Sequence, residues 1–287
     1  MDGVQELQSE FVPERSDSAT RIQSGVYLLE LSLDWIVLRA SENIHHLLRE
    51  SHVTLIDEPI GRFVHAQALH DLRNLFSRLG GTTGVARAYR VRLTDEPDLV
   101  DIAFQLRAGR VVLEAVSSAG GFGESFGSVG GLVSGLATAR GQALLDSAAR
   151  RMRALTGYDR IVLICGAQRA ESSRGAFASS VHVEASLPPV IADVEAPPVA
   201  IFPREDEDRA VDAALMGAPG RDALQSLAEA GVRATMRTSF DVDGLKGEFR
   251  CDSRTPREPN LELHAAAELF AQLFAMRLEI DRLKKAD

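Results

Sequence analysis

The chain has 287 residues, 45% hydrophobic and 25% charged, a composition typical of a soluble globular protein with room for two domains. Its net charge of −9, with 32 basic and 41 acidic residues, argues against a nucleic-acid partner. No apolar run approaches the roughly 20 residues of a membrane span, and the polar N-terminus lacks a signal-peptide core. The two cysteines match no zinc or disulfide framework, so we expect a reduced, cytoplasmic protein with no membrane partner.

The N-terminal part predicts an arm followed by a small mixed domain. Residues 1–24 are polar and predict an extended arm. Strands are expected at 26–31, 35–38, 85–93, 100–106 and 111–116, with helices at 43–49 and 66–79. This order of two strands, short helices and three strands assigns one domain to residues 25–118.

The stretch "AGGFGESFGSVGG" at 119–131 contains six glycines in thirteen residues. It lies between a predicted strand and a predicted helix, as a dinucleotide-binding loop would. Phe126 stands where that motif needs its third glycine, so we interpret 119–131 as a flexible linker.

Residues 132–287 predict a second domain that begins and ends with a helix. The apolar spacing predicts one helix over 132–155, a strand over 160–165 and a helix over 222–230. Two strands at 234–242 and 246–251 are joined by the tight-turn pair Asp243–Gly244, and a last helix covers 261–285.

The segment "VIADVEAPPVAIFPREDEDR" at 190–209 fits neither a central strand nor a helix. Pro197 and Pro198 remove two backbone donors, and the cluster after Pro203 is charged. The residues between them, 199–202, are too apolar for a free linker, so they need a surface to pack against.

Several segments resemble bacterial phytochromes. "RALTGYDRIVL", "VIADVEAPPVAI", "LAEAGVRATM" and "CDSRTPR" look like their GAF domain, and "RIQSGVYLLEL" looks like the start of their PAS domain. The likeness covers nearly the whole chain in the right order. It implies an α/β (α+β) fold in which a PAS domain at 25–118 precedes a GAF domain at 132–287, with antiparallel sheets flanked by helices.

The resemblance also implies a figure-of-eight knot, in which the arm passes through a lasso formed after the proline pair. We then expect Val199, Ile201 and Phe202 to pack against Ile22 of the arm and against the GAF sheet. The alternative is a plain surface loop.

Phytochromes sense light through a bilin, and the positions that would hold it here differ from the family pattern. Residues 1–31 contain no attachment cysteine, and 177–190 contain no Asp-Ile-Pro motif. Gly217 replaces an arginine that would bind a propionate. Ala223 and Ser226 stand where a histidine and a tyrosine are expected, and Asp252 and Ser253 replace a His-His pair. We therefore expect no cofactor, although the family pigment is biliverdin.

No other constellation predicts a catalytic or metal site. His45 and His46 are adjacent, so on a helix they cannot both face one ion. Cys165 and Cys251 lie in predicted strands, where a free cysteine usually acts as a small buried hydrophobe. We expect no enzyme activity.

The long helices carry more apolar surface than one sheet face can cover. Phe270, Phe274 and Leu278 form one stripe of the last helix, and a second stripe lies beside it. We expect a homodimer, as the resemblance implies, with intramolecular packing as the alternative. The interface residues expected are Leu136, Leu144, Leu269, Leu273 and Met276.

The sequence thus predicts a phytochrome-like sensory protein that has lost bilin binding and acts as a dimeric regulatory module with an unidentified protein partner. The alternatives are a red-light photoreceptor that holds its bilin noncovalently and a GAF sensor of another small ligand.

Overall fold

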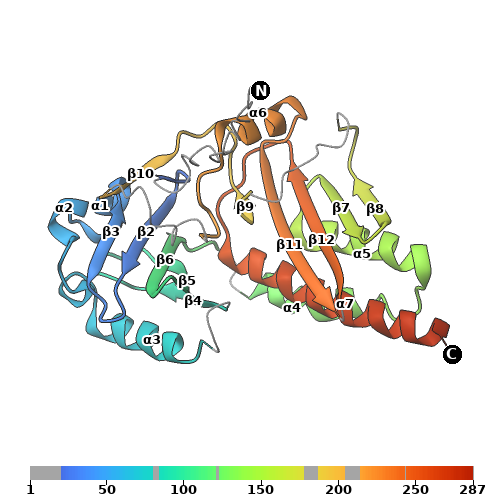
Figure 1. Cartoon of the computed structure of the whole chain (residues 1–287), viewed down its shortest axis with the longest axis horizontal. Helices are drawn as coiled ribbons and strands as arrows, with labels where there is room; N and C mark the ends of the chain where they lie inside the picture. Colours follow the sequence, from blue (N-terminus) through green and yellow to red (C-terminus); the bar gives the residue numbers. More distant parts are fainter. Residues whose placement is uncertain are drawn as a thin grey trace, which may run out of the picture.

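The computed structural model describes residues 21–79, 84–120, 123–177, 187–203, 214–242 and 244–286. Within these ranges the chain forms two antiparallel sheets with helices packed against them, the mixed α/β (α+β) class that the sequence predicts. The seven-stranded N-terminal sheet lies at the left of Figure 1, and the five-stranded C-terminal sheet lies at the right.

The N-terminal sheet is built mainly from the predicted hairpins. Its strands in spatial order are β1 (Arg21–Ile22), β10 (Val199–Phe202), β3 (Val37–Ser41), β2 (Val26–Leu31), β6 (Arg110–Ser117), β5 (Val100–Arg107) and β4 (Val85–Val91). The β5–β6 turn uses Ala108 and Gly109, both with positive φ, as a two-residue hairpin loop requires. One face is covered by η2 (Glu42–Ile44), α1 (His45–Leu48), α2 (His52–Leu55), η3 (Ile60–Arg62) and α3 (Ala66–Ser77).

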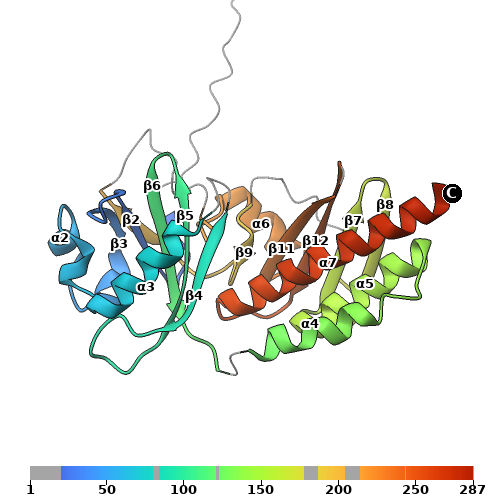
Figure 2. The same ribbon diagram turned by 90° about the horizontal axis from the view of Figure 1, so that it is seen from below.

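The C-terminal sheet packs one face against two long helices. Its strands in spatial order are β8 (Gln168–Ser173), β7 (Arg160–Cys165), β12 (Leu245–Ser253), β11 (Ala234–Val242) and β9 (Val190–Ile191). Helices α5 (Gly141–Thr156) and α7 (Leu261–Ala286) run beside each other along this face (Figure 2). Phe249 of β12 packs edge to face with Phe270 and Phe274 of α7. Helix α6 (Arg221–Glu229) matches the helix predicted over 222–230.

The two sheets share one apolar core. Val26 and Val112 of the N-terminal sheet are buried in the same cluster as Leu144 of α5 and Phe270 of α7. The side of the N-terminal sheet that carries no helices of its own therefore packs against the C-terminal half.

The single helix expected over 132–155 is wrong, because the chain forms two helices there. Helix α4 (Glu124–Ser134) occupies much of the glycine-rich stretch expected as a linker, and α5 begins at Gly141. Between them Arg151 donates to the carbonyl oxygen of Gly135 at 3.0 Å. The guanidinium occupies the space that a Cβ at Gly135 would need, so a larger residue there would displace Arg151. The domain boundaries at 118 and 131 stay predictions.

The segment after the proline pair forms a strand inside the N-terminal sheet, which corrects the expectation of irregular structure. Strand β10 pairs with β1 on one side and with β3 on the other. Ile201 is fully buried and lies in the same apolar cluster as Ile22. Phe202 stacks on His52 of α2 at 4.8 Å, so its packing is against the N-terminal half and not against the C-terminal sheet.

Strand β1, which belongs to the arm, forms backbone contacts along both edges with residues that follow the proline pair. On one edge Ile22 pairs with Val199, and on the other it forms a bridge with Gly217. The backbone N–H of Gln23 donates to the carbonyl oxygen of Met216, and the backbone N–H of Ala218 donates to the carbonyl oxygen of Arg21. Residues 1–20 and 204–213, which would complete the predicted knot, lie outside the described residues, so the knot stays a prediction.

Candidate functional site

Charged side chains cover the face of the C-terminal sheet that points away from α5 and α7. On β12, Glu248, Arg250 and Asp252 alternate with the buried Phe249 and Cys251. This face was not predicted, although charged and buried residues alternate in the sequence "GEFRCDS".

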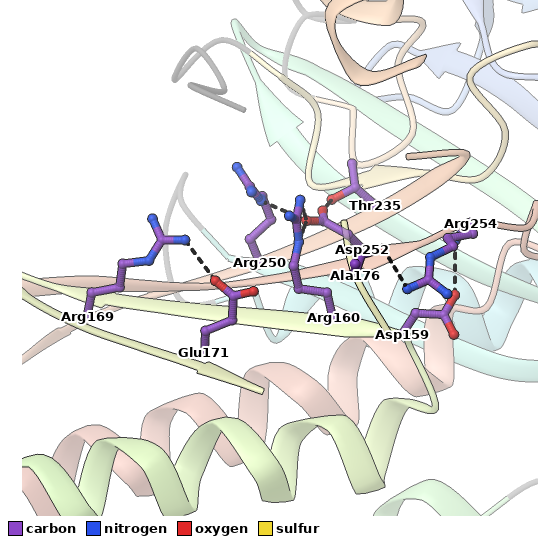
Figure 3. Close-up of polar contacts among 9 residues, drawn as sticks. All are labelled: Asp159, Arg160, Arg169, Glu171, Ala176, Thr235, Arg250, Asp252 and Arg254. Atoms are coloured by element: carbon purple, nitrogen blue, oxygen red, sulfur yellow. Dashed lines mark hydrogen bonds and ion pairs between the residues drawn. The ribbon is translucent and has the colours of Figure 1, made fainter. Parts of the chain in front are cut away.

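Asp252 is the centre of this charged face (Figure 3). Its Oδ2 accepts from Nε and Nη2 of Arg160 at 3.0 and 2.8 Å and from Nε of Arg250 at 3.1 Å. Its Oδ1 accepts from the Thr235 hydroxyl at 2.9 Å. Asp252 is fully buried, and the two arginine side chains are only 3% and 8% exposed. The carboxylate is therefore committed to two buried cations.

Other arginines of this face have carboxylate partners as well. Arg237 donates from Nε and Nη2 to Glu248 at 3.1 and 2.6 Å. Arg169 donates to Glu171 at 2.9 Å near the sheet edge, where both side chains are more exposed.

Phe177 lies between two guanidinium groups. Arg160 stands 4.3 Å from the centre of its ring, and Arg254 stands 4.4 Å from it. Arg254 is fixed in turn by the carbonyl oxygens of Arg174 and Ala176. The aromatic ring covers the Arg160 end of the buried charge cluster.

The two thiols of the sequence lie on the opposite, helix-covered side of the sheet. Cys165 is 2% exposed and Cys251 is fully buried, as expected from their strand positions. Burial raises the pKa of the Cys165 thiol. Burial, and then the nearby Asp252 carboxylate, raise the pKa of the Cys251 thiol. Because the thiolate is the reactive form, both cysteines are poor nucleophiles.

The five positions at which the sequence departs from the bilin-binding pattern lie on α6, on β12 and in the segment before α6. Asp252 lies on the charged face, whereas Gly217 lies at the arm crossing. Ala223 packs at the edge of a small cluster around Ile191, and Ser226 is exposed and donates to Asp222. Ser253 is buried and accepts from Arg257 at 3.2 Å. The segment 178–186, in which the Asp-Ile-Pro motif was sought, lies outside the described residues.

No three His, Cys, Asp or Glu side chains in the described ranges are grouped so that they could hold a metal ion. Among the helices that the structure describes, none is long and apolar enough to cross a membrane.

The arrangement of the two sheets matches solved phytochrome structures. The chromophore-binding domain of an unusual bacteriophytochrome from R. palustris superposes with a TM-score of 0.76 at 25% identity, over 95% of this chain and 99% of that one. The chain has the fold of a bacteriophytochrome chromophore-binding domain. The PAS–GAF architecture expected from the sequence is thereby confirmed.

Two further structures show the same fold. The chromophore-binding domain of a Stigmatella aurantiaca phytochrome gives a TM-score of 0.74 at 22% identity, over 93% of this chain and 96% of that one. A longer structure of the R. palustris bacteriophytochrome gives 0.78 at 22% identity, over 95% of this chain, which spans 61% of that one. No protein-family model and no curated protein matches the sequence.

In this PAS–GAF fold, two buried charged side chains of the PAS sheet form hydrogen bonds with the backbone just before and just after residues 204–213. Arg39, fully buried on β3, donates from Nε to the carbonyl oxygen of Pro203 at 2.9 Å. Glu114, fully buried on β6, accepts from the backbone amides of Leu215 and Met216 at 2.7 and 2.8 Å. The sequence analysis missed both residues; the signal for Glu114 is one acidic residue within the apolar run "VVLEAV".

The GAF helix α7 carries the two predicted stripes, and only one of them is covered. Phe270, Phe274 and Leu278 are buried against the sheet. The second stripe adds two residues to the predicted set and follows heptad spacing: Leu269, Leu273, Met276, Ile280 and Leu283. Four of these side chains are exposed, whereas Leu273 is partly buried against the core. Met276 is 60% exposed and Leu283 is 59% exposed, so this stripe is open in the single chain.

Leu136 and Leu144 are wrong as interface residues. Both are fully buried within the chain, in the core under α4, α5 and α7, so neither can reach a partner. The expectation failed because it assumed one straight helix over 132–155.

Proposed function

We propose that the chain is a phytochrome-like sensory module that does not bind a bilin and acts as a dimeric regulatory protein. We also propose that the protein is cytoplasmic, that it acts on a protein partner not yet identified, and that it catalyses no reaction. The structural likeness to photosensory domains supports the sensory role.

The burial of both thiols is the observation that carries the proposal. A covalently held bilin needs a reactive cysteine, and the sequence contains only Cys165 and Cys251. Both side chains point into the helix-covered core, away from the charged face of the GAF sheet. Attachment at either one would require unpacking that core.

The charge pairing on the GAF sheet supports the same conclusion for a noncovalently held bilin. Propionate groups need cations, and Arg160 and Arg237 already bond to Asp252 and Glu248. If either arginine turned to a propionate, a largely buried carboxylate would lose one of its cationic partners. Such a loss costs several kcal/mol.

The absorption spectrum tests this proposal. After co-expression with biliverdin synthesis, the purified protein should be colourless, with no band in the red region and no zinc-induced fluorescence of a protein-bound bilin. A stoichiometric, photoconvertible red band would establish the alternative, a working photoreceptor.

Dimer formation is proposed from the exposed stripe of α7. Full burial of a large apolar side chain contributes roughly 1.5–3 kcal/mol, so two copies of the stripe packed together offset a substantial part of the ordering cost. A two-fold pair of α7 helices closes the stripe on itself.

Replacing Met276 with Glu should convert the dimer into a folded monomer. Met276 is 60% exposed, so the charge disturbs the partner contact and not the core. Light scattering at micromolar concentration should give twice 31.1 kDa for the unmodified chain and 31.1 kDa for the variant. Val53→Glu is the matched control, because Val53 is 73% exposed on the distant α2. An unmodified chain that scatters as a monomer would contradict the dimer.

A further inference from the structure

The segment 214–217 is a junction of three parts of the molecule. Glu114 of the PAS sheet binds its amides at Leu215 and Met216. The arm bonds to it through the amide of Gln23, which donates to the Met216 oxygen. The GAF sheet bonds to it through the Val190 amide, which donates to the Leu215 oxygen at 3.0 Å. Glu114 therefore bonds to the same short segment as the arm and the GAF sheet.

Among the residues that the structure describes, the groups around Glu114 do not neutralise it at close range. Across the sheet, Ala103 separates it from Arg87, and Arg87 donates to His264 at 3.1 Å and to Glu268 at 2.7 Å. The described part of the junction, 214–217, brings no charged side chain to this position, and Gln23 of the arm is neutral.

The other acids on this face of the PAS sheet have partners of their own. Glu30 of β2 lies opposite Val112, two residues before Glu114 on β6, and it forms ion pairs with Arg39 and Arg110. Asp101 of β5 lies opposite Val116, two residues after Glu114 on β6. It accepts hydrogen bonds from the backbone amide of Arg90 and the hydroxyl of Ser118.

We propose that Glu114 is a proton-dependent latch, which holds segment 214–217 on the PAS sheet when protonated and releases it more readily when ionised. The contact places the fully buried Glu114 carboxyl group in the junction with two amide donors, and the residues that the structure describes there bring no cation next to it. Opening of the segment returns that carboxyl to water, where the charged form is favoured. The fold thereby contains a pH-responsive element that needs no pigment.

The direction of the pH effect follows from the pKa of Glu114 in the closed, buried state and in the open, exposed state. Burial raises the pKa of Glu114 to about 7, although the two amides and Arg87 oppose the shift, and the exposed group has a pKa of 4.5. The contribution of Glu114 to closure is thus complete below 4.5 and is lost as the pH rises through about 7. These two values make the opening equilibrium rise about 10-fold from about pH 6 to about pH 8. Burial lowers the pKa of His264, the other buried titratable group that contacts Arg87.

Hydrogen exchange of the Leu215 and Met216 amides in the full chain tests the latch. After correction for the intrinsic exchange rate, their opening equilibrium should rise about 10-fold between about pH 6 and about pH 8. Amides of β7 serve as the internal reference for global opening. In Glu114→Gln, which cannot ionise, the opening equilibrium should be independent of pH.

Two results would overturn the proposal. One is an opening equilibrium that does not change with pH in the unmodified chain, and the other is an unchanged pH dependence in Glu114→Gln. If that variant does not fold, the carboxyl carbon shift of Glu114 in the unmodified chain decides: a midpoint near 7 supports the latch, and one near 4.5 refutes it.

Discussion

Ile201→Asp should be among the most destabilising single substitutions in this chain. Ile201 is fully buried where β10 pairs with Ser41 of β3, in the core that both sheets share. The change removes a large apolar side chain and places a charge with no partner in that core. Together these effects should lower the free energy of unfolding by about 4 kcal/mol or more, and denaturant unfolding measures it.

Two controls separate burial from strand disruption. Ile201→Val keeps the strand and the apolar character, so it should cost only about 0.5–1.5 kcal/mol. Val53→Asp introduces the same charge on an exposed helix position and should stay within about 0.5 kcal/mol of the unmodified chain. An unchanged denaturation midpoint for Ile201→Asp would mean that β10 is an exposed loop in solution.

Asp252→Asn should destabilise the GAF sheet by about 3–5 kcal/mol, because breaking a buried ion pair leaves its partners uncompensated. The amide keeps the shape of the side chain but cannot neutralise Arg160 and Arg250, which are almost fully buried. Thermal and denaturant unfolding both report this loss.

Glu171→Gln is the matched control on the same sheet face. Its pair with Arg169 has similar geometry, but the side chains are 39% and 46% exposed, so the change should cost less than about 1 kcal/mol. Equal effects of the two substitutions would show that Asp252 is hydrated and that the charged face is open. An open face would leave the arginines accessible to an anionic ligand and would weaken the proposed loss of bilin binding.

The sequence predicts the elements whose pattern is local. Short apolar runs predict β5 and β6, which are buried on both faces, and helical periodicity predicts α7, because each pattern follows directly from what the element buries. Strand β10 could not be predicted this way, since it becomes a strand by pairing with β1 and β3, more than 150 residues away in the sequence. Helix α4 is helical despite its glycines because it packs on α7, where Glu262 accepts from the Gly123 amide at 2.8 Å.

The site was only partly predictable for the same reason. The resemblance located Asp252 as a substituted position, but its partner Arg160 lies on another strand, and their pairing depends on the register between β7 and β12. The contact of Glu114 with Leu215 joins residues about 100 positions apart. Single acidic residues inside apolar strands, such as Glu114 and Glu30, were the available signal, because a buried charge needs a partner.

Thermal unfolding of the purified chain with and without biliverdin tests the loss of pigment binding most directly. A ligand present at about 100 times its Kd stabilises the folded state by about 2.7 kcal/mol and raises the Tm by several degrees. A bacteriophytochrome chromophore-binding domain measured in parallel provides the positive control. We expect no shift in Tm for this chain at any soluble biliverdin concentration, and a saturable rise of several degrees would contradict the account.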